Sequence, residues 1–384
     1  MTTQLLIQPR DPLLFRDGRP FTADPGAMAQ SLDWPMPSTV AGAVRTLIGN
    51  ANGFAWQKGG PQLALQIRIR GPLAVVEGKD GECGIYVPAP ADVLWFEEGK
   101  SSDVLRPRRT LPEGAGCTMP AAGLMPVSVS AKEKPCTRIA SWPMESALSF
   151  LREGKVPNAN ECIERFPREA RTHVRMNAQT LTADPGGLFS TESLCIPDVT
   201  IQRTNTRRTG LLVQVLADYE APRNCFFPLG GERRAALATD GKFPWPEPPE
   251  GWLEKLAKTV SGKKRIKLQL VTPAVFANGW RPGWIGDDLS GTVPGTGIRV
   301  RLVSACVPRP IGFSGWDYEK GKPKAASYAA PAGSVYFFEI TSGDADADEL
   351  GKLFLAPLCD ESRFSNDGFG LALPGVWDYA GEAQ

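Results

Sequence analysis

Two short stretches near the N-terminus hold residue types that bind phosphate groups. Arg16 and Arg19 lie in a polar turn after the first expected strand, and Ser38 and Thr39 follow a proline at an expected helix start. Guanidinium groups neutralise phosphates, and backbone N–H groups at a helix start approach phosphate oxygens closely. The pattern favours contact with a polyanion, to which Arg45 in the same helix adds a charge. Simple helix capping beside solvated arginines is the alternative.

A second group of candidates lies in the middle of the chain. His173 and Arg175 occupy one extended segment, and Phe189 follows the turn-forming residues 184–187. This order predicts a hairpin tip between 181 and 188. Single-stranded RNA is bound by stacking of its bases on aromatic rings and by cations on its phosphates, so these three side chains are candidate RNA contacts. Packing of Phe189 against its own domain explains that ring equally well.

Other basic clusters precede expected strands. Three arginines before the strand at 211–217 are candidate phosphate contacts, namely Arg203, Arg207 and Arg208. A further basic strip covers residues 263–267. Ordinary solvated surface is an equal explanation for clusters of this kind.

The chain is poor in groups for catalysis. His173 is the only histidine, so one subunit cannot supply a pair of imidazoles for acid–base chemistry. The acidic residues between 344 and 349 favour a solvated helix start over a metal site. The sequence has neither a Gly-x-Gly-x-x-Gly stretch after a strand nor a Walker-type signature, so nucleotide hydrolysis is not expected. We therefore predict no enzyme activity, no metal and no cofactor.

Composition is typical of a protein in a reducing compartment. The 43 basic and 42 acidic side chains nearly cancel, so attraction to a polyanion must come from local patches. Eight cysteines are spaced singly, without a Cys-x-x-Cys pair, which argues against structural zinc. Because no charged-then-apolar leader and no apolar run of about 18 residues is found, we expect a cytoplasmic location.

Hydrophobic periodicity predicts a strand at 5–7 followed by a helix. The apolar face of that helix consists of Val40, Val44, Leu47 and Ile48. Ser38 or Thr39 is expected to cap the helix and Gly49 to end it. Arg45 is expected to point away from the apolar face.

The remaining periodic segments repeat this pattern. Strands are expected at 65–70, 211–217, 266–271, 298–303 and 335–340, with helices at 144–151, 252–260 and 350–354. The order predicts an α+β fold of two tandem ferredoxin-like (RRM-like) domains with long insertions. The first domain spans residues 1–225 and contains an inserted arm at about 88–206. The second spans residues 226–384 and contains a glycine-rich loop.

Several short pieces recur in a fixed order along nearly the whole chain. They are the segments 11–21 and 34–45, His173-Val174-Arg175-Met176-Asn177, Gly186 to Glu192, Leu229-Gly230-Gly231-Glu232-Arg233, Ala332 to Phe338, and Gly368-Phe369-Gly370. Their order resembles the third-subunit family of Cmr-type (type III-B) CRISPR effector complexes, within the repeat-associated RNA-binding superfamily.

The resemblance implies a non-catalytic RNA-binding subunit of a ribonucleoprotein that acts in antiviral defence. Such a subunit holds the repeat-derived 5′ handle of the CRISPR RNA. It docks against the large palm-domain (polymerase-like) subunit on one side and the first backbone subunit on the other. The glycine-rich loop of the superfamily contacts RNA backbone, so Gly368 and Gly370 join the candidate contacts. The hairpin around residues 181–188 would pass beside the guide RNA, where an apolar tip separates a nucleotide.

Two other functions remain open from the residues alone. The chain is alternatively an endoribonuclease that matures CRISPR RNA with His173 as acid or base. A third possibility is a protein scaffold without RNA contacts, held by exposed aromatic residues such as Trp280, Trp284 and Trp316.

Overall fold

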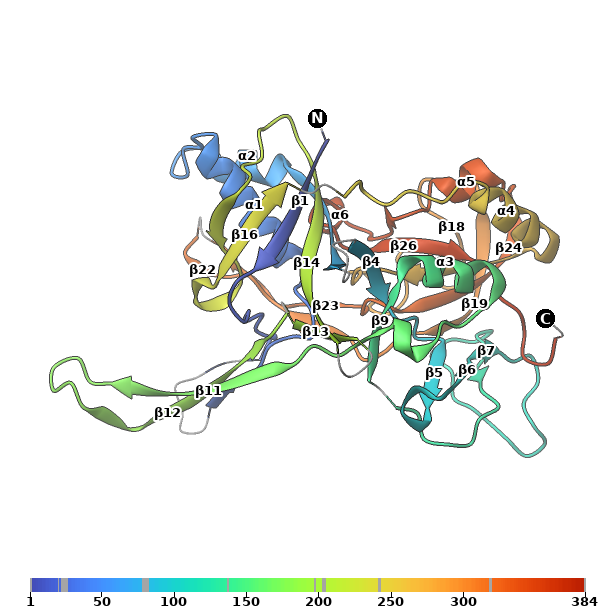
Figure 1. Cartoon of the computed structure of the whole chain (residues 1–384). Coiled ribbons are helices and arrows are strands. Elements are labelled where there is room, and N and C mark those ends of the chain that lie inside the picture. The colour runs from blue at the N-terminus through green and yellow to red at the C-terminus, as the bar shows by residue number, and fades with distance from the viewer. Residues whose placement is uncertain are drawn as a thin grey trace. The chain divides into compact units, whose positions relative to one another are not determined.

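The computed structural model describes residues 2–19, 21, 27–77, 83–136, 138–196, 198–201, 205–240, 243–317 and 320–382. The chain folds into two compact units, each assembled from three separate stretches of sequence (Figure 1). Unit 1 comprises residues 1–83, 165–244 and 311–328, and unit 2 comprises residues 84–164, 245–310 and 329–384. The predicted inserted arm is therefore shared, because residues 88–164 group with unit 2 and residues 165–206 with unit 1.

The described residues form many strands and few helices, which confirms the predicted α+β class. Unit 1 contains β1 (Thr2–Pro9), β2 (Ala27–Ala29), α1 (Pro37–Ala51), α2 (Gly60–Gln66), β3 (Arg68–Glu77), β11 (Arg168–Met176), β12 (Ala183–Leu194), β13 (Asp198–Ile201), β14 (Asn205–Leu216), β15 (Cys225–Pro228), β16 (Ala235–Asp240), β20 (Ile311–Phe313), β21 (Trp316–Asp317), β22 (Lys322–Pro323) and β23 (Ser327–Ala329). Unit 2 contains β4 (Cys83–Pro88), β5 (Val93–Phe96), β6 (Ser101–Val104), β7 (Arg106–Pro107), β8 (Val127–Ser128), β9 (Ile139–Pro143), α3 (Met144–Glu153), β10 (Ile163–Glu164), α4 (Trp252–Lys263), β17 (Arg265–Leu270), β18 (Ser290–Thr292), β19 (Arg299–Cys306), β24 (Val335–Ser342), α5 (Ala347–Gly351), β25 (Ala356–Pro357), α6 (Ser362–Asn366) and β26 (Leu371–Gly375).

The sheet of unit 1 is antiparallel, with neighbouring strands in the order β3-β14-β1-β16-β15. Alternate residues of β1, such as Leu5 and Ile7, are fully buried because one face of the sheet carries α1. Val40, Val44 and Ile48 of that helix are buried in the same core. The periodicity of the sequence therefore identified the core-facing side of α1 correctly.

The ends of α1 differ from the prediction. Met36 is the N-cap residue and no side chain caps the helix, so the expected capping by Ser38 or Thr39 is wrong. Gly49 does not end the helix, which continues to Ala51. A Cβ atom at Gly49 would lie 2.5 Å from the ring of Trp56, so this glycine makes room for the ring and does not end the helix.

The next predicted strand also begins later than expected. Residues up to Gln66 belong to α2, and β3 starts at Arg68. The predicted strand at 211–217 is confirmed as the apolar half of β14, which pairs with both β1 and β3.

The main sheet of unit 2 has six strands in the order β18-β19-β24-β17-β26-β25, and neighbouring strands are antiparallel. The predicted strands at 266–271, 298–303 and 335–340 are confirmed as β17, β19 and β24. The predicted helices at 144–151 and 252–260 are confirmed as α3 and α4.

The late helix of unit 2 is shifted towards the acidic run. It spans Ala347–Gly351 because the Asp346 carboxylate caps it by accepting from the backbone N–H of Glu349 at 2.8 Å. The acidic residues therefore form a helix start, as the sequence indicated.

Candidate nucleic-acid interface

The most prominent feature of unit 1 is a long antiparallel ribbon, hereafter the arm, made of β11 and β12 (Figure 1). Its tip is the turn at residues 177–182, where the Asn177 side-chain oxygen accepts from the backbone N–H groups of Gln179 and Thr180. The predicted hairpin is confirmed, but its tip, predicted at 181–188, lies earlier in the chain, since residues 183–188 belong to β12. They coincide with a register shift between Val174 and Met176, so the Gly-rich sequence marks an irregularity rather than the turn.

One face of the arm carries an aromatic cluster. His173 and Phe189 are directly opposed across the two strands, and their rings stack with centroids 5.1 Å apart and planes at 16°. The edge of Phe21 packs on Phe189 at 5.8 Å. The His173 Nε2 atom lies 2.9 Å from the hydroxyl oxygen of Thr191, which fixes the imidazole plane. The stack therefore presents a held flat surface of the kind on which a nucleobase stacks.

Cations surround this cluster. The Arg16 guanidinium lies over the ring of Phe21, 5.2 Å from its centroid. Arg175 donates from Nε to the carboxylate of Asp184 at 2.9 Å, and half of its side chain stays exposed. Arg175, Phe21 and Phe189 line a shallow cleft of about 210 Å³ together with Gly187. The structure thus brings together four of the predicted contacts, namely Arg16, His173, Arg175 and Phe189.

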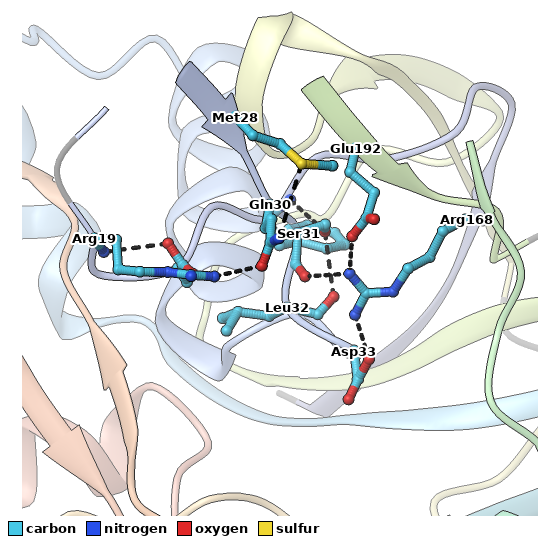
Figure 2. A network of polar contacts seen from close by, with 10 residues as sticks. Arg19, Met28, Gln30, Ser31, Leu32, Asp33, Arg168 and Glu192 are labelled. Atoms are coloured by element: carbon cyan, nitrogen blue, oxygen red, sulfur yellow. Dashed lines mark hydrogen bonds and ion pairs between the residues drawn. The ribbon is translucent and has the colours of Figure 1, made fainter. Parts of the chain in front are cut away.

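The base of the arm is tied to the N-terminal loop by Arg168 (Figure 2). Its guanidinium donates to the backbone oxygen of Ser31 at 2.9 Å and forms ion pairs with Asp33 and Glu192. Partial burial opposes the charge, but the hydrogen bonds that Arg168 donates to both carboxylates prevail and raise its pKa above the ordinary value. Arg168 therefore stays protonated as an internal clamp.

Arg19 also lies near this loop (Figure 2). Its guanidinium contacts Asp17 and the side-chain oxygen of Gln30, both at 2.5 Å. Two thirds of the Arg19 side chain is exposed. Its charge is therefore partly balanced but accessible to a ligand.

The opposite face of the arm is apolar and exposed. Val174 and Leu188 are directly opposed on it, and Met28 of β2 lies opposite Ser190. The exposed fractions of these side chains are 45% for Val174, 57% for Leu188, 44% for Met28 and 52% for Met176. The arm is thus two-sided, with cations and rings on one face and aliphatic side chains on the other.

The candidates at the start of α1 differ in how far their side chains are exposed. Ser38 and Thr39 are half-buried in the first turn of α1. Arg45 is 6% exposed and donates from Nε to the backbone oxygen of Ile67 at 2.9 Å, so its predicted outward orientation is wrong. Arg45 therefore has a structural role inside unit 1, where its hydrogen bond to a buried carbonyl links α1 to the end of α2.

The three arginines predicted to precede the strand at 211–217 are only partly described. Arg207 and Arg208 belong to β14 and their backbones pair with Val199 and Asp198 of β13. Arg203 lies outside the described residues. The roles of these arginines in RNA binding stay predictions.

The glycine-rich loop is buried within unit 2. Gly368, Phe369 and Gly370 are all buried, and the Gly368 oxygen accepts from the hydroxyl of Thr272 at 2.8 Å. Gly370 has a φ of 77°, and a Cβ atom there would lie 3.0 Å from the backbone nitrogen of Leu358. Close packing and a left-handed backbone therefore account for this glycine without a ligand.

Three of the four cations in the basic strip of residues 263–267 form ion pairs within unit 2. Lys263 contacts Asp378 at 2.6 Å, and Arg265 forms an ion pair with Glu382. Lys267 is almost fully buried. Lys263 and Lys264 nevertheless keep exposed side chains, so only Arg265 and Lys267 are withdrawn from the surface.

Among the described residues, no three His, Cys, Asp or Glu side chains are placed to hold a metal ion. Burial raises the pKa of the Cys162 and Cys359 thiols to about 12, so both remain protonated and unreactive near neutral pH. No described helix is long and apolar enough to span a membrane.

Comparison with known proteins identifies the class. The model of a family described as CRISPR-associated protein (Cas_Cmr3) matches residues 5–377, nearly the whole chain. The protein is therefore a CRISPR-associated subunit of the Cmr type. It belongs to the Cmr3 family of type III-B effector complexes, which confirms the resemblance drawn from the sequence.

Solved structures give more distant likenesses. A chain of the type III-B Cmr-beta complex bound to cognate target RNA and AMPPnP is 14% identical, with a TM-score of 0.47, and the match covers 87% of this chain and 86% of that one. A Cmr-beta complex bound to cognate target RNA gives 15% identity, a TM-score of 0.46 and the same coverage. A chain of the Csm3-Csm4 subcomplex of a type III-A complex is 10% identical, with a TM-score of 0.36 and coverage of 90% and 94%. A search of curated protein sequences finds no match.

Proposed function

We propose that this chain is a non-catalytic RNA-binding subunit that holds the repeat-derived 5′ handle of the CRISPR RNA in a cytoplasmic type III-B complex. In this role it bridges the large palm-domain subunit to the backbone subunits. Membership of the Cmr3 family supports a place in such a complex. The handle, the bridging role and the individual contacts are our inference.

A shared strand order supports ferredoxin-like cores in both units. In unit 1 the strands β1, β3, β14 and β16 follow one another along the chain and lie in the spatial order β3-β14-β1-β16. In unit 2 the strands β17, β19, β24 and β26 lie in the order β19-β24-β17-β26. Both arrangements place the first and third strands at the centre, as in a ferredoxin-like sheet. We therefore infer two such cores, decorated by the arm and the other insertions.

The observation that carries the proposal is the held aromatic stack beside exposed cationic side chains. His173 and Phe189 stack at 5.1 Å, and Arg16 and Arg175 flank the rings of the cluster. Bases of single-stranded RNA stack on rings, while guanidinium groups bind its phosphates. We place the handle strand on this face, with Arg19 at its border.

The same stack argues for binding rather than cleavage. The His173 ring is covered by Phe189 and its Nε2 atom is engaged with Thr191 at 2.9 Å. A general acid or base must reach the proton that it transfers. An imidazole held in this way is better suited to support a base than to act on a phosphodiester.

Charge reversal on the cluster tests the proposal. In the complex reconstituted with CRISPR RNA, we expect Arg16→Glu with Arg175→Glu to weaken RNA retention at least tenfold. The affinity should also depend less steeply on salt, because fewer counterions are released. Arg223→Glu is the matched control, since Arg223 is also a half-exposed, ion-paired arginine of unit 1. Unchanged RNA retention by the double variant in the assembled complex would reject this interface.

A further inference from the structure

A second exposed element of unit 1 comes from the other half of the sequence. Residues 311–328, here called the Trp316 hairpin, group with unit 1 although the segments on either side belong to unit 2. The backbone N–H of Gly18 donates to the oxygen of Gly312 at 3.2 Å. A Cβ atom at Gly18 would lie 3.1 Å from the Gly312 carbonyl carbon, so the two backbones approach closely at this glycine. The hairpin is therefore tethered to the turn that bears Arg16 and Arg19.

The base of the Trp316 hairpin is well defined. Phe313 is buried, and the hydroxyl of Ser314 donates to the backbone oxygen of Lys324 at 2.7 Å. The backbone N–H of Lys324 donates in turn to Gly315 at 2.8 Å. These bonds hold β21 against β22, with Trp316 opposite Pro323.

The hairpin exposes rings and ammonium groups on both sides of this base. Trp316 is 51% exposed and Tyr328 is 66% exposed. Lys322 and Lys324 are also exposed. Leaving half of a tryptophan side chain in water forgoes stabilisation by burial, so the ring is available to a ligand.

We propose that the Trp316 hairpin is a second contact for single-stranded RNA, in which Trp316 stacks on a base and Lys322 and Lys324 neutralise phosphates. The inference rests on the proposed function, because it extends the RNA path from the arm to this element. Rings interleaved with cations are the usual composition of single-strand binding surfaces, which tolerate any base.

The composition favours RNA over a protein partner. Lysine is depleted in the buried core of protein–protein interfaces, whereas it is a direct ligand of phosphate in nucleic-acid complexes. Three exposed lysines, Lys320, Lys322 and Lys324, lie within five residues of one another on this hairpin. Of these, Lys320 is partly balanced by Asp317 at 3.8 Å.

Continuity with the arm is the second argument. Gly18, which contacts the Trp316 hairpin, lies between the two cationic residues of the N-terminal turn. Arg16 of that turn reaches over Phe21, and Phe21 packs on Phe189 of the arm. A strand bound by the arm therefore meets Arg16 and then the Trp316 hairpin within the same unit.

The test uses the complex reconstituted around CRISPR RNA. Because stacking of one base on a ring contributes about 1–3 kcal/mol, we expect Trp316→Ala to weaken RNA binding roughly tenfold. Lys322→Glu with Lys324→Glu should lower the salt slope by about 1 to 1.5, the change for two single-strand phosphate contacts. The controls are Phe226→Ala, an aromatic residue of unit 1 that is 68% exposed, and Lys58→Glu.

Crosslinking detects the proposed contact directly, even if the changes in RNA affinity are small. With a photoreactive phenylalanine in place of Trp316, we expect crosslinks to the RNA of the complex. Crosslinks to protein alone, or RNA affinity equal to that of the controls, would overturn the inference. If charge reversal at Arg16 and Arg175 still weakens binding, the proposed function survives that result. If neither set of variants changes RNA binding, both proposals fail.

Discussion

The imidazole of His173 lies flat against the ring of Phe189, with 16° between the two planes. The two residues are directly opposed in the ribbon of β11 and β12, so the backbone register itself sets the stack. Thr191 fixes the histidine through its hydroxyl oxygen. His173 is the only histidine of the chain and forms part of this stack. Variants of His173 can therefore distinguish RNA binding from RNA cleavage.

We expect His173→Ala to weaken retention of CRISPR RNA several-fold in the reconstituted complex, because it removes one ring of the stack. His173→Phe keeps a ring at the same position and should retain most of the binding. The measurement is RNA retention at increasing salt for both variants. An equal loss in His173→Phe would mean that the imidazole nitrogens, and not the stacked ring, carry the effect.

The same variants test the endoribonuclease alternative. The purified chain incubated with repeat RNA should give no cleavage, with or without His173→Ala. Cleavage by the unmodified chain that disappears in His173→Ala would contradict the non-catalytic function.

Gly370 permits a test of the buried glycine-rich loop. We expect Gly370→Ala to lower the free energy of unfolding by about 2 kcal/mol, because the new Cβ atom meets backbone at 3.0 Å and φ is positive. Unfolding in urea measures this loss. Gly262→Ala in α4 is the control, since a Cβ atom there has no neighbour within 4 Å and alanine favours a helix. A stable Gly370→Ala chain that fails to retain RNA would instead restore this loop as an RNA contact.

Periodic burial explains which parts of the fold the sequence predicted. Val40, Val44 and Ile48 recur at helical spacing, β17 and β19 alternate apolar and polar residues, and β24 begins with an apolar run, so each element was found near its true position. The boundaries of the elements were harder to predict. Gly49 resembles a helix stop, yet its position depends on Trp56, which packs against it from the turn after α1. Such a contact between loop and helix leaves no periodic signal.

The candidate site was predicted in part for a similar reason. His173, Arg175 and Phe189 were found because they cluster along the sequence. Phe21 was missed, since only the packing of the N-terminal loop on the arm brings its ring to Phe189. Arg45 was assigned to the surface because charge usually favours exposure. A buried carbonyl of Ile67 satisfies its guanidinium instead, and that partner is far away in the sequence.

A buried ion pair in unit 2 yields a stability prediction. Lys267 contacts Asp92 at 3.0 Å, and its ammonium group lies 3.9 Å from the centroid of the Phe150 ring. Both charged side chains are less than 5% exposed. We expect Lys267→Met to lower the free energy of unfolding by about 3–5 kcal/mol, because it leaves the carboxylate buried without its cation.

A double variant distinguishes the cost of an unpaired buried charge from the cost of lost packing. Lys267→Met with Asp92→Asn removes both charges, so most of the lost stability should return in urea unfolding. If the double variant is as unstable as Lys267→Met alone, the loss comes from packing against Phe150, and the ion pair contributes little.

Glu339 of β24 predicts how unit 2 responds to acid. Partial burial opposes ionisation of this carboxyl, but hydrogen bonds from Tyr379 at 2.5 Å and Arg301 at 2.7 Å prevail and lower its pKa below 4.5. A carboxyl whose pKa is lower in the folded state stabilises the fold above its unfolded pKa, and this contribution is lost as pH falls through the folded value. We expect Glu339→Gln to cost about 2 kcal/mol at pH 7 and clearly less at pH 3 in urea unfolding. Glu254→Gln, on the exposed face of α4, should change stability by less than about 0.5 kcal/mol at both pH values. A Glu339→Gln loss that is the same at both pH values would show that shape, and not charge, holds this network together.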